Sequence, residues 1–207
     1  MQETNEELTL EEYNDIVLHY REALSMIKLR LDALNDEYRR NQTHCPIHYI
    51  QHRIKKKDSM EGKLRRRGIK ISKENVMENL TDIAGIRVIC YFEEDIFTII
   101  KHIKRQQDVL IIKECDYVQN PKPNGYRSYH IILGIPVYHD EKTEYYPVEI
   151  QIRTISMDLW ASMDHRICYK KDSMENKDTM QQYSKALHQM EAEMKALYDG
   201  TEQTLEV

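Results

Sequence analysis

Two carboxylates in separate segments could hold a divalent metal ion. Asp82 lies in "TDIAGIRVICYF", just before Gly85, and Glu149 lies in the alternating stretch "VEIQIRT". Because side chains alternate across a strand, Glu149, Gln151 and Arg153 should face one side and the Val and Ile residues the other. The open alternative is structural: an ordinary amphipathic strand, and an ion pair between Asp82 and Arg87 at the head of a buried strand.

A dense group of cations precedes both carboxylates. Residues 53–70, "RIKKKDSMEGKLRRRGIK", contain nine Lys or Arg and two acidic residues, a local charge of +7 in a chain of formal net charge −5. The rest of the chain therefore sums to −12. A local basic patch in an acidic chain favours a focused anion site over general nucleic-acid binding. We expect the segment to be helical, and a solvated helix face is the alternative.

A rigid loop supplies a third group of binding side chains. The stretch "NPKPNGYRSYHI", residues 120–131, contains two prolines and a glycine and then alternates like a half-buried strand. Its side chains able to bind a ligand are Lys122, Asn124, Tyr126, Arg127, Ser128 and His130. Cations suit phosphate, and an aromatic ring in a stiff loop offers a stacking surface for a base.

Together these groups are what phosphoryl transfer requires. A divalent metal ion held by carboxylates bridges a polyphosphate, while Lys and Arg neutralise charge on the leaving oxygens. A hydroxyl nucleophile also needs a positioned proton acceptor.

Periodicity predicts the elements that position these residues. A long amphipathic helix over about 10–39 begins with a capping box of Thr9 and Glu12. Strands are expected at "GIRVICYF", "VLIIKECD", "SYHIILGIPVYH" and "EYYPVEIQIRT", the last two joined by the turn "DEKT". Further helices are expected at "EEDIFTIIKHIKRQQ", at "SMDLWASMDHRICYKK" with Ser156 as N-cap, and, after the polar stretch 171–178, over about 179–199, ended by Gly200. Strands between terminal helices predict an α+β domain with one mixed central β-sheet.

Composition limits the class of protein. At 207 residues one domain is expected, with 41% hydrophobic residues to form its core. No apolar run approaches the ~20 residues of a membrane span, and the acidic N-terminus lacks a signal core. The four cysteines are scattered, which favours reduced thiols in a cytoplasm. By ligand type His44, Cys45, His48 and His52 could hold zinc, although Pro46 interrupts their spacing.

Four motifs, with the basic segment before them, resemble those of a known family. They are "DIAGIRV", "DYVQNPKPNGYRSYH", "VEIQIRT" and "WASMDHRICYK", in order over about residues 45–171. In this combination the chain resembles RelA/SpoT-type alarmone synthetases, and its length is similar to that of the small members. The resemblance implies a single synthetase domain over 1–207 with a nucleotidyltransferase-like fold.

The resemblance also implies a reaction of the stringent response. Pyrophosphate passes from ATP to the ribose 3'-hydroxyl of GDP or GTP, giving ppGpp or pppGpp and AMP. Asp82 would hold Mg²⁺, and Glu149 would hold the metal ion or orient and deprotonate the hydroxyl, two roles that the sequence leaves open.

The resemblance also implies which residues bind the two nucleotides. ATP would be bound by Arg53, Lys55, Lys63, one of Arg66 or Arg67, and Arg87. GDP or GTP would be bound by Lys122, Asn124, His130 and Gln151, with Tyr126 stacked on guanine. Residues 113–116, where long synthetases carry a motif that biases acceptor choice, match neither of its versions, so acceptor preference stays open.

Assembly and two other functions complete the expectations. The terminal helices could simply cover the sheet, but the family tendency toward homotetramers favours an oligomer, with (p)ppGpp as an allosteric effector in a central cleft. The alternatives are a regulator that binds single-stranded RNA and a toxin that pyrophosphorylates the tRNA 3' end. The pair of Asp82 and Glu149 disfavours the first, and the acidic N-terminus disfavours the second.

Overall fold

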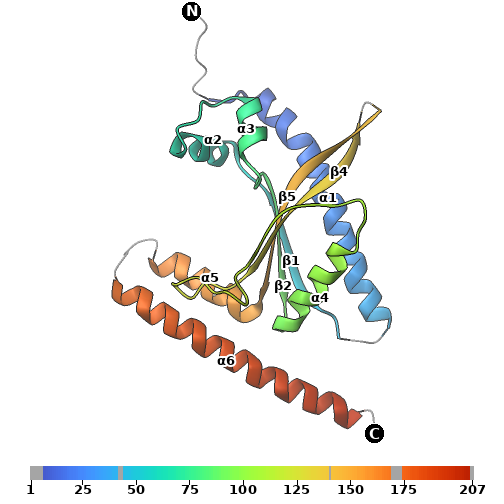
Figure 1. The fold of residues 1–207 in the computed structure, drawn as a ribbon, viewed down its shortest axis with the longest axis vertical. Helices are drawn as coiled ribbons and strands as arrows, with labels where there is room; N and C mark the ends of the chain where they lie inside the picture. The colour runs from blue at the N-terminus through green and yellow to red at the C-terminus, as the bar shows by residue number, and fades with distance from the viewer. Residues whose placement is uncertain (1–6, 42–43, 140, 169–173, 206–207) are drawn as a thin grey trace, which may run out of the picture.

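A five-stranded mixed sheet forms the centre of the fold (Figure 1). The computed structural model describes residues 7–41, 44–139, 141–168 and 174–205. The strands are β1 (Ile47–Ile54), β2 (Ala84–Cys90), β3 (Leu110–Asp116), β4 (Tyr129–His139) and β5 (Lys142–Thr154), in the order β1-β2-β5-β4-β3. β2 and β5 are parallel, and the other neighbours are antiparallel. The predicted α+β fold with a mixed central sheet is confirmed.

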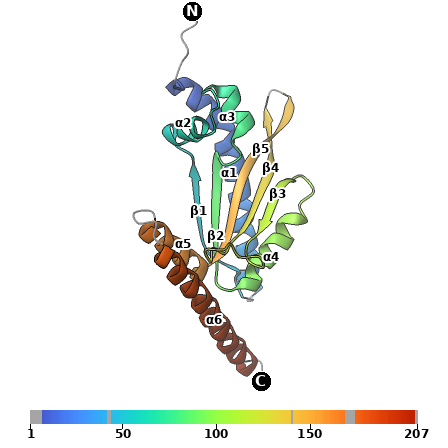
Figure 2. The same cartoon turned by 60° about the vertical axis from the view of Figure 1, so that its left-hand side comes forward.

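Helices α1 (Leu10–Arg40) and α4 (Glu93–Lys104) cover one face of this sheet (Figure 2). α1 begins with the predicted capping box, in which Thr9 Oγ1 accepts the N–H of Glu12 and the Glu12 carboxylate accepts the N–H of Thr9. Its buried apolar stripe packs with the apolar sides of β2, β4 and β5 in one core: Ile16, Tyr20, Leu24, Ile27, Leu31 and Leu34. The polar sides of the same strands are thereby left on the opposite face.

The basic segment is not one helix, which corrects the prediction. Arg53 lies near the end of β1, and only then do α2 (Lys57–Arg66) and α3 (Lys73–Asn79) follow. Gly68 between them has φ +68°, a conformation that glycine adopts readily. The strand was missed because β1 is an edge strand whose side chains are mostly exposed, so its sequence "IHYIQHRI" lacks the alternation of a half-buried strand.

Helices α5 (Ile155–Cys168) and α6 (Met174–Leu205) pack against each other at one end of the sheet (Figures 1 and 2). Ser156 lies inside α5 and is not its N-cap, because Thr154 Oγ1 accepts the N–H of Met157 instead. α6 runs through Gly200, since one exposed glycine costs a helix only about 1 kcal/mol. Asp140 of the predicted turn, residues 169–170 of the predicted helix and residues 171–173 of the polar stretch lie outside the described residues.

No helix in the described ranges is both long and apolar enough to cross a membrane.

Candidate active site

Strand register brings the predicted residues together in rows across the open face of the sheet. Arg53 on β1 is opposite Gly85 on β2, and Gly85 is opposite Glu149 on β5. Since cross-strand partners project to the same side of a sheet, Arg53 and Glu149 share one surface. Gly85 has no side chain to separate them.

A second row lies two residues along the same strands. Gln51 is opposite Arg87, Arg87 is opposite Gln151, and Gln151 is opposite His130 on β4. Four strands that are far apart in the sequence thus contribute to one polar surface. Arg87 was predicted at the head of its strand, but it is the fourth residue of β2.

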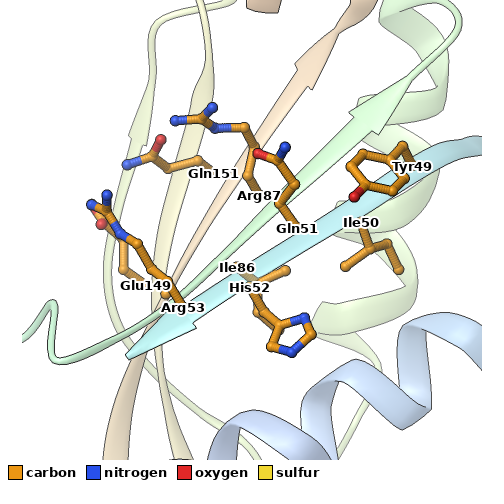
Figure 3. Close-up of a pocket in the computed structure, with 10 residues that line it drawn as sticks. Tyr49, Ile50, Gln51, His52, Arg53, Ile86, Arg87, Glu149 and Gln151 are labelled. Atoms are coloured by element: carbon orange, nitrogen blue, oxygen red, sulfur yellow. The ribbon is translucent and has the colours of Figure 1, made fainter. Parts of the chain in front are cut away.

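A cavity of about 440 Å³ opens on this surface. It is lined by Tyr49, Ile50, Gln51, His52, Arg53, Gly85, Ile86, Arg87, Glu149 and Gln151. Figure 3 shows Arg53, Arg87, Glu149 and Gln151 projecting to the same side of the strands. Four predicted site residues therefore line one cavity. Tyr49 and Gln51 were not predicted, because β1 itself was not.

Asp82 lies between two lysines. Its Oδ2 is 2.9 Å from Lys55 Nζ and 2.8 Å from Lys63 Nζ. Burial by itself raises the pKa of Asp82, but the hydrogen bonds from the two lysines outweigh it and hold that pKa below its ordinary value. The structural alternative, an ion pair between Asp82 and Arg87, is wrong, because Arg87 pairs with Asp158 at 3.3 Å.

Glu149 connects the cavity to the loop that precedes β4. His130 Nδ1 is 3.7 Å from Glu149 Oε1, and His130 Nε2 is 2.7 Å from the hydroxyl of Tyr126. The His130 imidazole lowers the pKa of Glu149, against the opposing effects of burial and of the Asp82 charge.

Residues 117–128 are named the acceptor loop, after the role that the sequence resemblance implies for them. Side chains of this loop and of the sheet hold Tyr126 in place. Arg153 Nη2 donates to the Tyr126 hydroxyl at 2.7 Å, and the guanidinium carbon lies 5.1 Å from the ring centroid. Lys122 Nζ lies 5.0 Å from the same centroid. Asn124 Oδ1 accepts the N–H of Tyr126, and the chain turns at Gly125 with φ +93°. The ring is therefore ordered before any ligand binds.

Arg153 and Asp158 are site residues that the sequence analysis missed. Arg153 is 5% exposed and donates to Gln151 Oε1 at 3.1 Å and to Asp158 Oδ1 at 3.2 Å. The alternation of "VEIQIRT" had placed Arg153 on the face of Glu149, and that was the available signal. Asp158 lies on α5, and no local pattern in the sequence indicates its contact with Arg87.

Two of the predicted phosphate-binding residues, Arg66 and Arg67, do not line the cavity. Arg67 donates to the carbonyl of Asn79 at 2.7 Å, at the end of α3. Arg66 is exposed near the end of α2 and does not line the cavity. The sequence left open which of these two arginines would bind phosphate. Since the Arg67 side chain is bonded to α3, Arg66 is the better candidate.

Buried polar atoms without hydrogen-bond partners are concentrated at this site. In the part of the chain that the structure describes, they are His19 Nδ1, Asp82 Oδ1, Arg87 Nε and Arg153 Nε. Three of the four belong to the residues described above. A buried polar group without a partner is costly, so these three atoms indicate a place for a polar ligand.

Known proteins resemble the chain over this whole region. Residues 52–174 match the family model described as "Region found in RelA / SpoT proteins". The GTP pyrophosphokinase YwaC of Bacillus subtilis is 41% identical over 161 residues, which cover 78% of this chain and 77% of YwaC. 

Solved structures agree with the sequence match. The small alarmone synthetase 1 from Bacillus subtilis, bound to its product pppGpp, superposes with a TM-score of 0.83 at 28% identity, over 93% of this chain and 99% of that chain. The same synthetase bound to AMPCPP gives a TM-score of 0.74 at 26% identity, over 93% and 99%. With a family model matched over more than half of its length and a relative this similar across most of both chains, the protein belongs to the RelA/SpoT family.

Proposed function

We propose that this protein transfers the pyrophosphate of ATP to the ribose 3'-hydroxyl of GDP or GTP, producing ppGpp or pppGpp and AMP. The observation that supports this best is the cavity in which Arg53, Arg87 and Glu149 meet, connected through His130 to Tyr126. The relatives named GTP pyrophosphokinase and small alarmone synthetase support the same reaction. The single synthetase domain then spans 1–207.

ATP is assigned to the cavity and to the lysines beside Asp82. Arg53 and Arg87 flank the nucleotide, and Lys55 and Lys63 lie where its phosphates can be neutralised. The 3'-oxygen attacks the β-phosphorus of ATP, the bond from that phosphorus to the α–β bridging oxygen breaks, and AMP leaves. Cations around the phosphates stabilise the charge that moves to the leaving oxygen.

Asp82 and Glu149 fit a divalent cation. Asp82 Oδ1 is buried without a hydrogen-bond partner, and carboxylate oxygen is the ligand type that Mg²⁺ prefers. Mg²⁺ often takes only one or two protein carboxylates beside substrate phosphates, so no larger acidic cluster is needed. When bound, the ion would neutralise charge on the transferring phosphates. A carboxylate has two oxygens, so Glu149 can contribute to that site and also accept the proton of the 3'-hydroxyl.

GDP or GTP is assigned to the acceptor loop, with guanine on the ring of Tyr126. Arg153 is buried and bonded to the hydroxyl of this ring, whereas Lys122, also close to the ring, is exposed. The base therefore displaces Lys122, whose ammonium is then free to meet the acceptor phosphates. Asn124 keeps the loop in its turn, and His130 and Gln151 complete the acceptor side next to Glu149.

Removing the Tyr126 ring should weaken acceptor binding alone. Tyr126→Ala is expected to raise the KM for GDP by about 5- to 150-fold, the effect of about 1–3 kcal/mol of base stacking, with the KM for ATP unchanged. Initial rates at varied GDP and ATP measure both constants. Tyr138→Ala is the control. It removes a tyrosine ring that is 68% exposed on β4 and does not line the cavity. An equal change in both KM values would contradict the assignment.

One assay separates the three candidate functions. The protein is incubated with ATP, Mg²⁺ and either GDP, GTP or tRNA, and the products are resolved by chromatography. AMP together with ppGpp or pppGpp is the expected result. Pyrophosphorylated tRNA would favour the toxin, and salt-sensitive RNA binding without nucleotide turnover would favour the regulator.

We further propose a homo-oligomer, a tetramer by the family tendency, with (p)ppGpp as an effector. Large apolar side chains on α6 are at least half exposed: Tyr183, Met190, Met194 and Leu197. A row of this kind on one helix is suited to a protein interface. Sedimentation at micromolar concentration should give a mass above that of one chain, and a monomer would contradict the assembly.

The proposed location is the cytoplasm. Cys90 and Cys115 are cysteines without a disulfide, the state that a reducing compartment maintains.

A further inference from the structure

Helix α6 is fixed to the rest of the fold on both sides of Ser184. One turn before Ser184, the carbonyl of Met180 accepts the indole N–H of Trp160 at 2.6 Å. Two turns after it, the buried Glu191 accepts the hydroxyl of Thr154 at 2.5 Å, at the end of β5. These anchors hold α6 in place without any help from the acceptor loop.

Ser184 is where α6 meets the acceptor loop. It is 8% exposed, and its Oγ donates to the carbonyl of Gly125 at 2.6 Å. The two backbones are also in close approach, because a Cβ on Gly125 would lie 2.9 Å from Ser184 Cβ and 3.1 Å from Gln181 Cα. Only a glycine allows the loop to lie this near the helix, and the hydrogen bond fixes it there.

This contact is transmitted to Tyr126, the next residue in the chain. The Tyr126 hydroxyl is bound by Arg153 at 2.7 Å, so the residue is attached to the sheet at its outer end and to α6 through its backbone neighbour. A ring fixed at both ends loses little conformational entropy when a ligand stacks on it. We propose that Ser184 is a positioning residue for the acceptor, whose hydrogen bond to Gly125 sets the Tyr126 ring where guanine stacks. This inference rests on the proposed function.

A second contact keeps the loop folded when Ser184 is changed. Arg127 Nη2 donates to Glu93 Oε2 and to the carbonyl of Val118, each at 2.9 Å. Glu93 in turn lies 3.6 Å from His188 Nδ1 on α6. Loss of the Ser184 hydroxyl therefore loosens the loop at Gly125, next to Tyr126, and leaves the loop attached at Arg127.

The first test is the variant Ser184→Ala. Loss of one buried hydrogen bond is expected to raise the Kd for GDP, measured by calorimetric titration, about three- to tenfold. The KM for ATP, and kcat at saturating GDP, should stay at wild-type values. Gln182→Ala, at an exposed position of the same helix, is the control and should change neither constant. If Ser184→Ala raised the KM for ATP as much as the Kd for GDP, or left the Kd for GDP unchanged, the inference would be overturned.

The second test asks whether Ser184 acts through the ring. In the background of Tyr126→Ala, the additional change Ser184→Ala should leave the Kd for GDP where Tyr126→Ala alone puts it. Additive effects would overturn the inference, because a general structural role of Ser184 would persist without the ring. Failure of the proposed function is seen separately, as wild-type protein that binds GDP and ATP but forms no AMP.

Discussion

Replacement of Glu149 by glutamine is expected to lower kcat by about a thousandfold while ATP and GDP still bind. Glutamine has almost the same shape, so the row with Arg53 and Gly85 is kept. The amide carries no charge and accepts a proton poorly, so it supports neither a cation beside Asp82 nor the loss of the 3'-hydroxyl proton. Initial rates of AMP formation measure kcat, and calorimetry measures nucleotide binding.

The same substitution elsewhere on β5 provides the control. Glu144 is about half exposed, and its carboxylate accepts the hydroxyl of Tyr146 at 3.0 Å, away from the cavity. Glu144→Gln should keep wild-type turnover. If Glu149→Gln also kept near-normal turnover, Glu149 would have no part in the chemistry, and the proposed site would have to be abandoned.

Replacement of Asp82 by asparagine is expected to lower turnover by on the order of a hundredfold and to raise the Mg²⁺ concentration required. The change removes the charge that Lys55 and Lys63 share, and it removes an anionic oxygen that is placed to bind a cation. Because Asp82 does not contact the acceptor loop, the Kd for GDP should be unchanged. The measurement is the rate of AMP formation as a function of Mg²⁺ concentration.

Asp58 offers a matched control for this second substitution. It is an exposed aspartate in the first turn of α2, within the same basic segment as the two lysines. Asp58→Asn removes one negative charge from this region without touching Asp82, so the Mg²⁺ dependence should stay as in the wild type. An Asp82→Asn variant with wild-type Mg²⁺ dependence would show that the cation binds elsewhere.

Much of the fold could be predicted because its signals are local. The α1 helix has a capping box and an apolar stripe, and β5 alternates cleanly from Val148 to Ile152, so both follow from neighbouring residues. The assignment of Glu149 and Gln151 to one face needed only that alternation. The motifs themselves indicated the family that the comparisons establish.

The remainder of the site depends on pairings that a sequence does not display. β1 is exposed on an edge, so its alternation is too weak to predict the row that ends at Arg53. Lys63 and Asp82 are joined only because α2 folds back over the start of β2. Arg153 could be placed on a face of β5, but its contacts with Tyr126 and Asp158 require the acceptor loop and α5 to be in position.

The most direct test of this account is a crystal structure with Mg²⁺, a nonhydrolysable ATP analogue and GDP. One Mg²⁺ is expected about 2.1 Å from an oxygen of Asp82 and from an oxygen of Glu149. The ATP analogue should lie against Arg53, and guanine should lie on the ring of Tyr126. A cation bound away from both carboxylates, or a 3'-hydroxyl of GDP out of reach of Glu149, would contradict it.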